Sequence, residues 1–245
     1  MPSPSISIIT SMFNSENYID RFMDNVISQT DFDQSELILI DANKDSEERF
    51  VSNYIKKHQN IKHFHISDFN LTKDPGVYGC WNLGIQNSSG EFITNMNLDD
   101  SRSHVALEKQ RECLNSNPEI DLVYYRTLET NEPNENFYKN SAKKEFPCFD
   151  HCYDFLLKVN SPHCQPMWRR SLHDRFGFFN ETLMSAGDYD MWLRAASRGS
   201  KMKKIDEVLG LYYRNPDGIS SGSKTLSKAI FEVNQIKKQY SKSYL

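Results

Sequence analysis

The chain has 245 residues, of which 38% are hydrophobic and 25% charged, and its formal net charge is −4. These values suit a soluble globular protein with one large α/β domain or two small ones, and the acidic balance disfavours nucleic acid as a partner. The five cysteines include no C-x-x-C pair, no leader pattern is visible and no apolar run approaches the ~18 residues of a membrane helix, so we expect a cytoplasmic protein, at most peripheral to a membrane, with no transmembrane segment.

The first half of the chain alternates between short apolar runs and segments of helical periodicity. A strand at 5–10 leads through turn residues at 14–18 into a helix that reaches about residue 29. Further strands are expected at 36–40, 61–66, 91–96 and 122–126, and further helices at 45–58, 77–87 and 105–115. This alternation predicts a mostly parallel central sheet flanked by helices, joined by right-handed crossovers in a single Rossmann-like α/β domain.

The second half of the chain is less regular. Residues 129–144 are rich in Asn, Glu, Lys and Pro and predict a long surface loop. The elements that we expect after it are a helix at 151–159, a strand at 167–169, a helix at 188–198, strand-like runs at 202–205 and 208–213, a flexible hinge at 218–223 and a helix at 226–240. The last two would form a C-terminal helical extension.

Three of the predicted strands end in short polar or acidic residues. The first ends in Thr10-Ser-Met-Phe-Asn14, the second in Asp41-Ala-Asn43, and the strand at 91–96 runs into Asn97-Leu-Asp-Asp100. In an open parallel sheet, ligands bind at the carboxyl ends of the strands. The three segments therefore predict one crevice that contains two acidic regions and several amide and hydroxyl groups.

Asp99 and Asp100 are adjacent carboxylates, which repel each other and resist dehydration. Such a pair is tolerable in a solvated turn, as the cap of the next helix, or around a cation, and its oxygens suit Mg²⁺ or Mn²⁺. The usual phosphate motifs are missing, because no glycine-rich turn follows the first strand and no Lys-Ser/Thr pair follows Gly84. If phosphates bind here, a metal must neutralise them.

Several segments, in chain order, resemble those of family 2 glycosyltransferases with the GT-A fold, and together they cover most of residues 5–220. The segments are the opening strand up to Asn14, Leu39-Ile-Asp-Ala42, Asp74-Pro-Gly-Val-Tyr-Gly-Cys-Trp-Asn-Leu-Gly-Ile85, Asn97-Leu-Asp-Asp100 in the place of the metal motif, Gly187-Asp-Tyr-Asp-Met-Trp-Leu-Arg194 in the place of the catalytic base, and the closing strand Leu211-Tyr-Tyr-Arg-Asn215.

This resemblance implies a metal-dependent, inverting glycosyltransferase with a nucleotide-sugar donor, expected to be a UDP-sugar. Asp188 would be the general base, Asp99 and Asp100 would hold Mn²⁺ or Mg²⁺, and Asp41 would contact the uracil base. The acceptor would be a carbohydrate, a lipid-linked molecule or a protein. The residues implied in nucleotide-sugar binding are Thr10, Ser11, Phe13, Asn14, Asp41, Asp74, Tyr78, Asn82, Asn97 and Asp99.

The same resemblance implies a glycosyltransferase domain at 1–217, with a donor half at about 1–126 and an acceptor half at 127–217, followed by the hinge and helix at 218–245. The chain departs from the family pattern where the metal motif begins with Asn97 instead of Asp and where Gly187 precedes the base instead of Glu. Neither change removes a required carboxylate.

Several alternatives stay open at this point. Asp188 precedes an apolar helix, so it could be a helix cap instead of a base. For His163, which follows Pro162, both a position near the metal or the diphosphate and a position away from them stay open. The alternative functions are a non-catalytic GT-A-like protein that binds carbohydrate or nucleotide, and a sugar nucleotidyltransferase, although the latter usually carries a glycine-rich, basic loop after the first strand.

Overall fold

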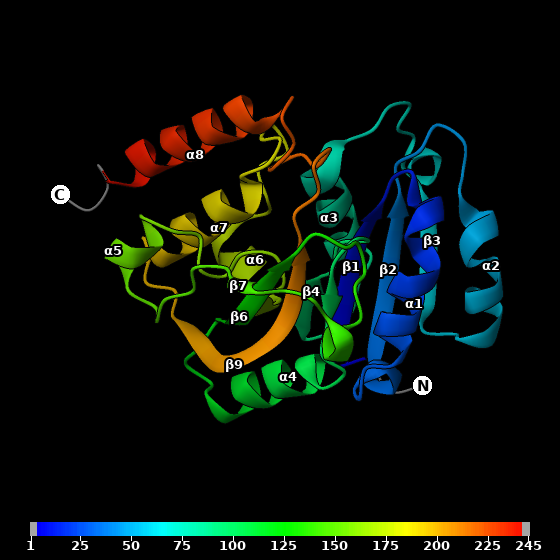
Figure 1. Cartoon of the computed structure of the whole chain (residues 1–245), viewed down its shortest axis with the longest axis horizontal. Helices are drawn as coiled ribbons and strands as arrows, with labels where there is room; N and C mark the ends of the chain where they lie inside the picture. The colour runs from blue at the N-terminus through cyan, green and yellow to red at the C-terminus, as the bar shows by residue number, and fades with distance from the viewer. Residues whose placement is uncertain (1–3, 242–245) are drawn as a thin grey trace.

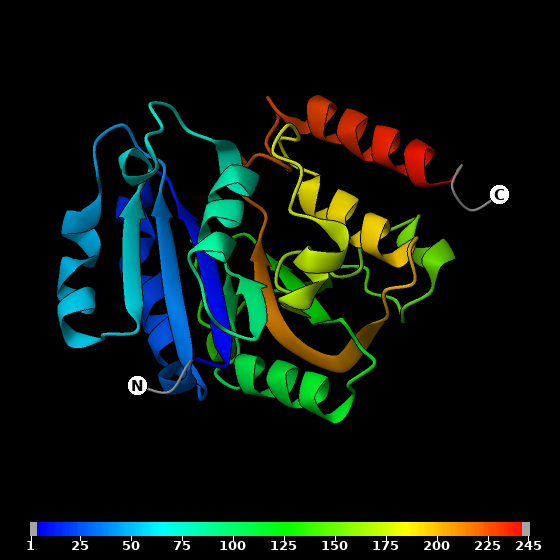
Figure 2. The same ribbon diagram turned by 180° about the vertical axis from the view of Figure 1, so that it is seen from behind.

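The computed structural model describes residues 4–241, in which nine strands form one sheet between two layers of helices (Figures 1 and 2). The strand order is β3-β2-β1-β4-β8-β6-β9-β5, and β7 pairs with β6. The strands are β1 (Ile6–Met12), β2 (Ser35–Asp41), β3 (Ile61–His65), β4 (Phe92–Asn95), β5 (Ser101–Arg102), β6 (Leu122–Thr130), β7 (Lys144–Glu145), β8 (Met167–Arg169) and β9 (Met202–Tyr213). The helices are α1 (Ile19–Ile27), α2 (Glu48–Lys57), α3 (Gly76–Gln86), α4 (Ala106–Ser116), α5 (Tyr153–Leu156), α6 (Ser171–Phe176), α7 (Gly187–Ala196) and α8 (Leu226–Ser241).

The first half of the sheet is parallel. β1 pairs in parallel with β2 and with β4, and β2 pairs in parallel with β3. β8 runs antiparallel to both β4 and β6, whereas β6 and β9 are again parallel. The α/β architecture with a central sheet flanked by helices is as predicted. The sequence did not predict that β8 runs antiparallel to its neighbours, because the three residues of this strand carry no pattern that indicates its direction.

The central strands are buried on both faces. Ile8 of β1 and Leu37 of β2 pack in one cluster with α1, α2 and α4, whereas Ile9 and Ile38 pack in another with α3 and α7. Successive side chains of a strand point to opposite faces of the sheet. This explains the continuous apolar run of β2, and it leaves the polar residues at the strand ends as the chemically distinct edge of the sheet.

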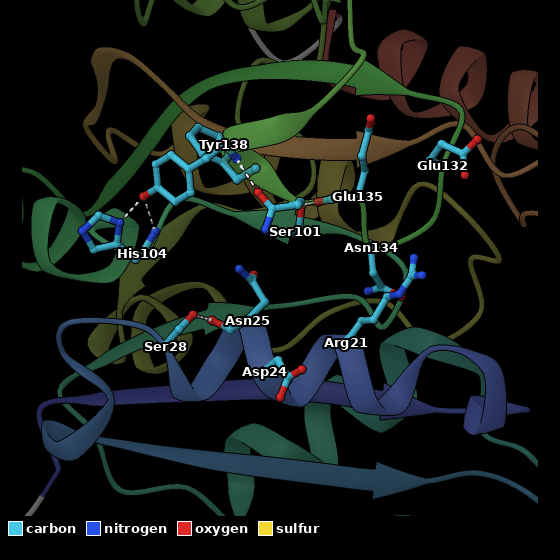
Figure 3. A pocket seen from close by; sticks show the side chains of 12 residues that line it. Arg21, Asp24, Asn25, Ser28, Ser101, His104, Glu132, Asn134, Glu135 and Tyr138 are labelled. Carbon is cyan, nitrogen blue, oxygen red and sulfur yellow. Dashed lines mark hydrogen bonds between the residues drawn. The ribbon is translucent and has the colours of Figure 1, made fainter.

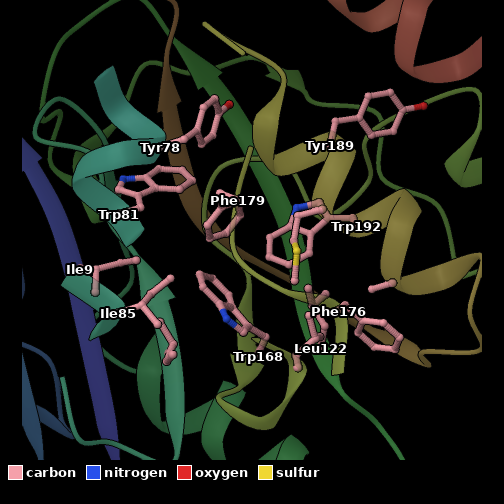
Figure 4. Packing of buried hydrophobic residues seen from close by; sticks show 14 of the residues in the cluster. Ile9, Tyr78, Trp81, Ile85, Leu122, Trp168, Phe176, Phe179, Tyr189 and Trp192 are labelled. Carbon is pink, nitrogen blue, oxygen red and sulfur yellow. The ribbon is translucent and has the colours of Figure 1, made fainter. Parts of the chain in front are cut away.

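An aromatic layer holds α7 against the sheet (Figure 4). The ring centres of Trp168 and Trp192 are 5.2 Å apart, and Phe179 lies 5.9 Å from Trp168 and 5.7 Å from Trp192. The edge-to-face geometry of these pairs is the favourable one for aromatic rings. Trp192 is therefore a core residue. Gly84 allows α3 to approach β1, because a Cβ atom there would lie 3.1 Å from Cγ2 of Ile9.

Several elements of the second half differ from the prediction. The helix expected at 151–159 is the single turn α5, and α6 follows β8 where no helix was predicted. The two runs expected at 202–205 and 208–213 form one strand, β9, whose pairing with β6 is irregular around Arg126. A bulge of this kind interrupts the regular alternation of side chains, which is why the sequence reads as two short strands.

The polar segment 129–144 is more ordered than a plain surface loop. It contains the 3₁₀ turn Phe137–Lys139 and the first residue of β7. Three more 3₁₀ turns lie in the first half, at Ser15–Asn17, Phe32–Gln34 and Ile66–Phe69.

The C-terminal helix α8 lies beside α7 at one end of the molecule (Figures 1 and 2), which confirms the helix predicted there. The Glu232 carboxylate anchors it by accepting hydrogen bonds from the backbone N–H groups of Met184 (2.8 Å) and Ser185 (2.9 Å). The boundary at residue 217 stays a prediction, and residues 1–3 and 242–245 of the predicted domains lie outside the described part. Between residues 4 and 241, no helix is both long and apolar enough to cross a membrane.

Candidate active site

The acidic turn Leu98-Asp99-Asp100 connects β4 to β5 and lies against the end of β9. The Asp100 carboxylate accepts hydrogen bonds from the backbone N–H of Tyr213 (2.9 Å) and from Nδ2 of Asn97 (3.0 Å). Asp99 accepts one from Nδ2 of Asn215 at 3.3 Å. The following helix α4 begins at Ala106, with another residue as its cap. The helix-cap alternative for Asp100 is therefore wrong.

The two carboxylates of this turn are costly to ionise together. Asp100 is 1% exposed, and burial together with the charge of Asp99 raises its pKa well above the ordinary value. Burial also raises the pKa of Asp99. A nearby guanidinium, that of Arg102, compensates only in part, and its Nη2 donates to the Asn95 carbonyl at 2.8 Å. A bound cation would therefore stabilise the charged form of both carboxylates.

The residues of the turn fit Mn²⁺ or Mg²⁺ in their chemistry. Asp99 and Asp100 offer hard carboxylate oxygens, and no group of three or more Asp, Glu, His or Cys residues is arranged as a metal cluster between residues 4 and 241. An ion with two protein carboxylates keeps its other positions for water and substrate phosphates, which is the usual arrangement for Mg²⁺. A site of this kind is incomplete without its phosphate ligand.

Asp188 lies in the first turn of α7, where the capping position is Ala186. Its carboxylate accepts hydrogen bonds from the Tyr78 hydroxyl (3.1 Å) and from Nδ2 of Asn160 (2.8 Å). Burial raises its pKa, which suits a group that must take up a proton. The absence of a side chain at Gly187 is required here, because a Cβ atom would lie 2.6 Å from Cδ2 of Tyr78.

Cys164 is a buried thiol on which the charges of both acidic centres act. Burial raises the pKa of its thiol well above the ordinary value, and the charges of Asp100 and Asp188 add to the effect. The Cys164 carbonyl accepts a hydrogen bond from Nδ2 of Asn95, at the end of β4, at 2.6 Å. The charges of Asp100 and Asp188, which are far apart in the sequence, therefore both reach the thiol of this residue, whose carbonyl is bonded to the end of β4.

Asp41 is fully buried and holds its own loop together. Its carboxylate accepts hydrogen bonds from Asn43 (N, 3.1 Å; Nδ2, 2.9 Å), the Glu47 N–H (2.6 Å), the Ser46 hydroxyl (3.2 Å) and His63 (3.2 Å). Burial opposes ionisation, but these hydrogen bonds outweigh it and lower the pKa of Asp41 to about 2. Asp41 therefore orders the loop at 41–47. Its direct contact with the uracil base of the donor stays a prediction.

The site residues predicted at the end of β1 and just after it lie beside β2 and this loop. Thr10 is 1% exposed, Ser11 is half-buried, and Phe13 is 54% exposed at the strand end. Asn14 has a left-handed backbone (φ 51°), and its N–H donates to Oδ1 of Asn43 at 3.1 Å. The ends of β1 and β2 are thus joined into one surface, on which the exposed Phe13 ring is free to stack on a planar ligand.

Two other residues predicted to bind the donor have structural partners. Asp74 is exposed, and its Oδ1 accepts from the Gly76 N–H at 2.7 Å at the start of α3. Asn82 is buried, donates to the Phe179 carbonyl (2.9 Å) and Glu181 (2.7 Å), and accepts from the Phe179 N–H (3.0 Å). Asn82 therefore positions the segment that precedes α7, and through it Asp188.

Three asparagines to which the sequence assigned no role in the site support the acidic centres. Asn160 and Asn215 donate to Asp188 and Asp99. Asn134, with a left-handed backbone (φ 49°), donates through its N–H to the Asp99 carbonyl (2.8 Å) and through Nδ2 to the Leu98 carbonyl (2.5 Å). They come from irregular segments whose composition does not distinguish them from ordinary loop residues.

His163 has a strained backbone, with a φ of 45°. Its ring stacks on Phe146 with centres 3.6 Å apart and meets the edge of Tyr212 at 4.5 Å. Burial, with a smaller effect of the Arg214 charge, lowers the pKa of His163 to about 3, so the ring is neutral at pH 7. No hydrogen bond or ring contact of His163 with the predicted site residues is found in the described region.

Two cavities lie near these residues. One, of about 590 Å³, lies between α1 and the segment 132–138 and is lined by Arg21, Ser101 and Asn134 among others (Figure 3). Of the predicted catalytic, donor and metal residues, none lines it. The other, of about 310 Å³, is lined by Asp188 and Asn160 together with residues of α7 and α8. The second cavity therefore adjoins the candidate base.

Comparison with known proteins places the chain in a family. The chain matches glycosyl transferase family 2 over residues 7–176 and belongs to that family. It is 24% identical over 239 residues to the uncharacterized glycosyltransferase MJ1057 of Methanocaldococcus jannaschii, covering 97% of this chain and 80% of the relative. It is 26% identical over 196 residues to the uncharacterized glycosyltransferase RT0329 of Rickettsia typhi, covering 78% of this chain and 58% of the relative.

Solved structures show the same GT-A fold. Residues 1–349 of S. aureus TarS, solved in complex with UDP-GlcNAc, align with a TM-score of 0.75 at 17% identity, covering 96% of this chain and 66% of that one. The mannosyltransferase PcManGT of Pyrobaculum calidifontis, solved with GDP-Man and Mn²⁺, aligns with a TM-score of 0.65 at 17% identity, covering 88% and 59%. The chain thus spans about two thirds or less of these structures and of the Rickettsia relative.

Proposed function

We propose that this protein is an inverting glycosyltransferase that moves a sugar from a nucleotide-sugar donor, a UDP-sugar in our proposal, to an acceptor hydroxyl. The observation that carries the proposal is the position of Asp188. Its carboxylate accepts hydrogen bonds from Tyr78 and Asn160 and adjoins a cavity, and its charge and that of Asp100 both raise the pKa of Cys164. Family membership and the complexes of TarS with UDP-GlcNAc and PcManGT with GDP-Man support a nucleotide-sugar donor.

The chemistry assigned to Asp188 is proton removal. The acceptor oxygen attacks the anomeric carbon of the donor while its proton passes to the Asp188 carboxylate, and the bond from the anomeric carbon to the diphosphate oxygen breaks. The electron pair of that bond leaves with the nucleoside diphosphate. A single displacement of this kind inverts the anomeric configuration and needs no covalent enzyme intermediate. The hydrogen bonds from Tyr78 and Asn160 fix the direction of the carboxylate.

Asp99 and Asp100 would hold the divalent cation in this proposal. The ion, when bound, would neutralise the diphosphate and stabilise the negative charge that develops on it as the sugar leaves. The Mn²⁺ complex of PcManGT is consistent with this assignment. Asn97, which donates to Asp100, would keep the carboxylate oriented.

Product analysis tests the proposed reaction. The protein is incubated with Mn²⁺, a set of UDP-hexoses and a set of simple hydroxyl acceptors, and the phosphorus-containing products are identified by NMR. Free UDP together with an inverted glycoside is the expected result. Release of pyrophosphate would identify a nucleotidyltransferase, and the absence of any turnover with intact UDP binding would favour a non-catalytic binding protein.

A further inference from the structure

The cavity beside Asp188 has walls from four segments that are distant in the sequence. They are the stretch after β7, the stretch after α5, the start of α7 with the two residues before it, and the middle of α8. Much of the lining is apolar and includes Phe146, Pro147, Val159 and Val233. Its volume of about 310 Å³ lies at the lower end of the range for small-molecule sites.

Two lysines, Lys158 and Lys237, also line this cavity. Nζ of Lys237 donates to the Lys158 carbonyl at 2.6 Å, and Nζ of Lys158 lies 5.4 Å from the ring centre of Phe155. Across residues 4–241, neither ammonium group has a carboxylate oxygen within the 4.0 Å of an ion pair. Glu232 on α8 does not neutralise them, because its carboxylate binds the backbone before α7.

The polar end of the cavity offers the opposite chemistry. Asp188 is a hydrogen-bond acceptor there, and Asn160 directs its Nδ2 to Asp188 while its Oδ1 has no hydrogen-bond partner within the described residues. A hydroxyl group of a sugar or polyol could donate to the Asp188 carboxylate. The cavity therefore offers a hydrogen-bond acceptor for hydroxyl groups at Asp188. On its walls it also carries the positive charges of Lys158 and Lys237.

We propose that this cavity binds the acceptor and that the acceptor is a sugar or polyol that carries a phosphate monoester. This inference rests on the proposed function, because it assigns the hydroxyl at Asp188 as the one that receives the sugar. The phosphate lies toward Lys158 and Lys237. A phosphate monoester carries a charge of about −1.5 to −2 at pH 7, which matches two ammonium groups. A neutral acceptor would gain nothing from these two charges.

The surroundings of the lysines increase the effect of such a charge. Partial burial lowers the pKa of Lys237, whereas Lys158 is exposed to solvent. Opposite charges attract more strongly near apolar walls than in bulk water. Val233 and Lys237 belong to α8, which lies beyond residues 7–176 where the chain matches the family. The charge selectivity is therefore a feature contributed in part by the C-terminal helix of this chain.

Calorimetry with glucose 6-phosphate and glucose as matched probes tests the inference. The titrations are done in EDTA, so that no metal at the acidic turn can collect phosphate. We expect glucose 6-phosphate to bind at least fivefold more tightly than glucose, with a preference that weakens as ionic strength rises. The double variant Lys158→Gln/Lys237→Gln should lose the preference, whereas Lys228→Gln/Lys238→Gln, on the exposed surface of α8, should keep it.

Equal affinity of the two sugars in the parent would overturn the inference, as would an unchanged preference in the Lys158→Gln/Lys237→Gln variant. Titration of UDP with Mn²⁺ on the same proteins separates this outcome from a failure of the proposed function. UDP binding without a phosphate preference removes only the acceptor assignment. A parent that does not bind UDP removes the proposed donor, whatever the sugar phosphate does.

Discussion

The hydroxyl of Tyr78, in the first turn of α3, donates a hydrogen bond of 3.1 Å to the carboxylate of Asp188, in the first turn of α7. This contact joins the donor half predicted at about 1–126 to the acceptor half. It exists because Gly187 leaves room for the tyrosine ring and because Asn82 fixes the segment that leads into α7. Asp188, the proposed base, and the two predicted halves are therefore positioned by one set of contacts.

Tyr78→Phe should shift the acidic limb of the pH–rate profile to higher pH. Burial raises the pKa of Asp188, and the hydrogen bond from Tyr78 opposes that rise. Without this bond the carboxylate holds its proton more tightly, so a base that must be deprotonated becomes active only at higher pH. The measurement is kcat against pH with a UDP-sugar.

Tyr189→Phe is the matched control for this shift, because the Tyr189 hydroxyl donates to the Leu156 carbonyl at 2.6 Å and not to Asp188. Its acidic limb should coincide with that of the parent. If Tyr78→Phe leaves the limb in place, or if both variants move it equally, the contact does not tune the base.

Asp188→Asn should reduce the transfer rate by about 10²–10⁴-fold, because the amide cannot take the proton of the acceptor hydroxyl. The affinity for UDP should change less than twofold. Asp190→Asn is the control, since Asp190 lies two residues away but accepts from the Tyr240 hydroxyl at 3.0 Å. Initial rates and calorimetry separate the two effects. Full activity in Asp188→Asn would assign the base to another group.

Asp41→Asn should destabilise the protein by about 2 kcal/mol at pH 7, since the pKa of Asp41 falls from 3.8 to about 2 on folding. A lowered pKa gives stability that is present above about pH 4 and is lost as the pH falls toward 2. The difference from the parent should therefore shrink over that window. Urea unfolding at pH 7 and pH 3 measures it. A difference that does not depend on pH would show that the charge of Asp41 is not responsible.

The same variant tests the contact between Asp41 and the uracil base that the resemblance implies. If Asp41 acts only by ordering its loop, Asp41→Asn should weaken UDP binding only as far as it disturbs that loop. Mn²⁺ should still raise the affinity for UDP. Comparison of uridine with UDP isolates the base end of the nucleotide. Unchanged affinity for uridine would remove Asp41 from nucleotide recognition altogether.

The sequence predicted the parallel half of the sheet well because its signals are local. β2 is continuously apolar, so it must be buried on both faces, and the position of Asp41 at its end follows directly. The meeting of β1, β2 and β4 at one edge also follows from their parallel direction. These two facts are enough to predict a crevice with an acidic turn.

The rest of the site depends on contacts that are distant in the sequence. Asn134 has a left-handed backbone, and Asn160 bonds to a partner 28 residues away. Neither feature produces a periodic pattern in the sequence. The pairing of β5 with β9 places the Tyr213 N–H on Asp100, yet β5 has two residues and no pattern of its own. Such features become visible only when the chain is folded.

The most direct test of the account is the binding of UDP to the acidic turn through a divalent cation. Calorimetry should give an affinity for UDP at least tenfold higher in Mn²⁺ than in EDTA. Asp100→Asn keeps the shape of a buried residue and should remove most of this difference, whereas Asp174→Asn, on the exposed side of α6, should keep it. Equal affinity of the parent in Mn²⁺ and in EDTA would contradict the account.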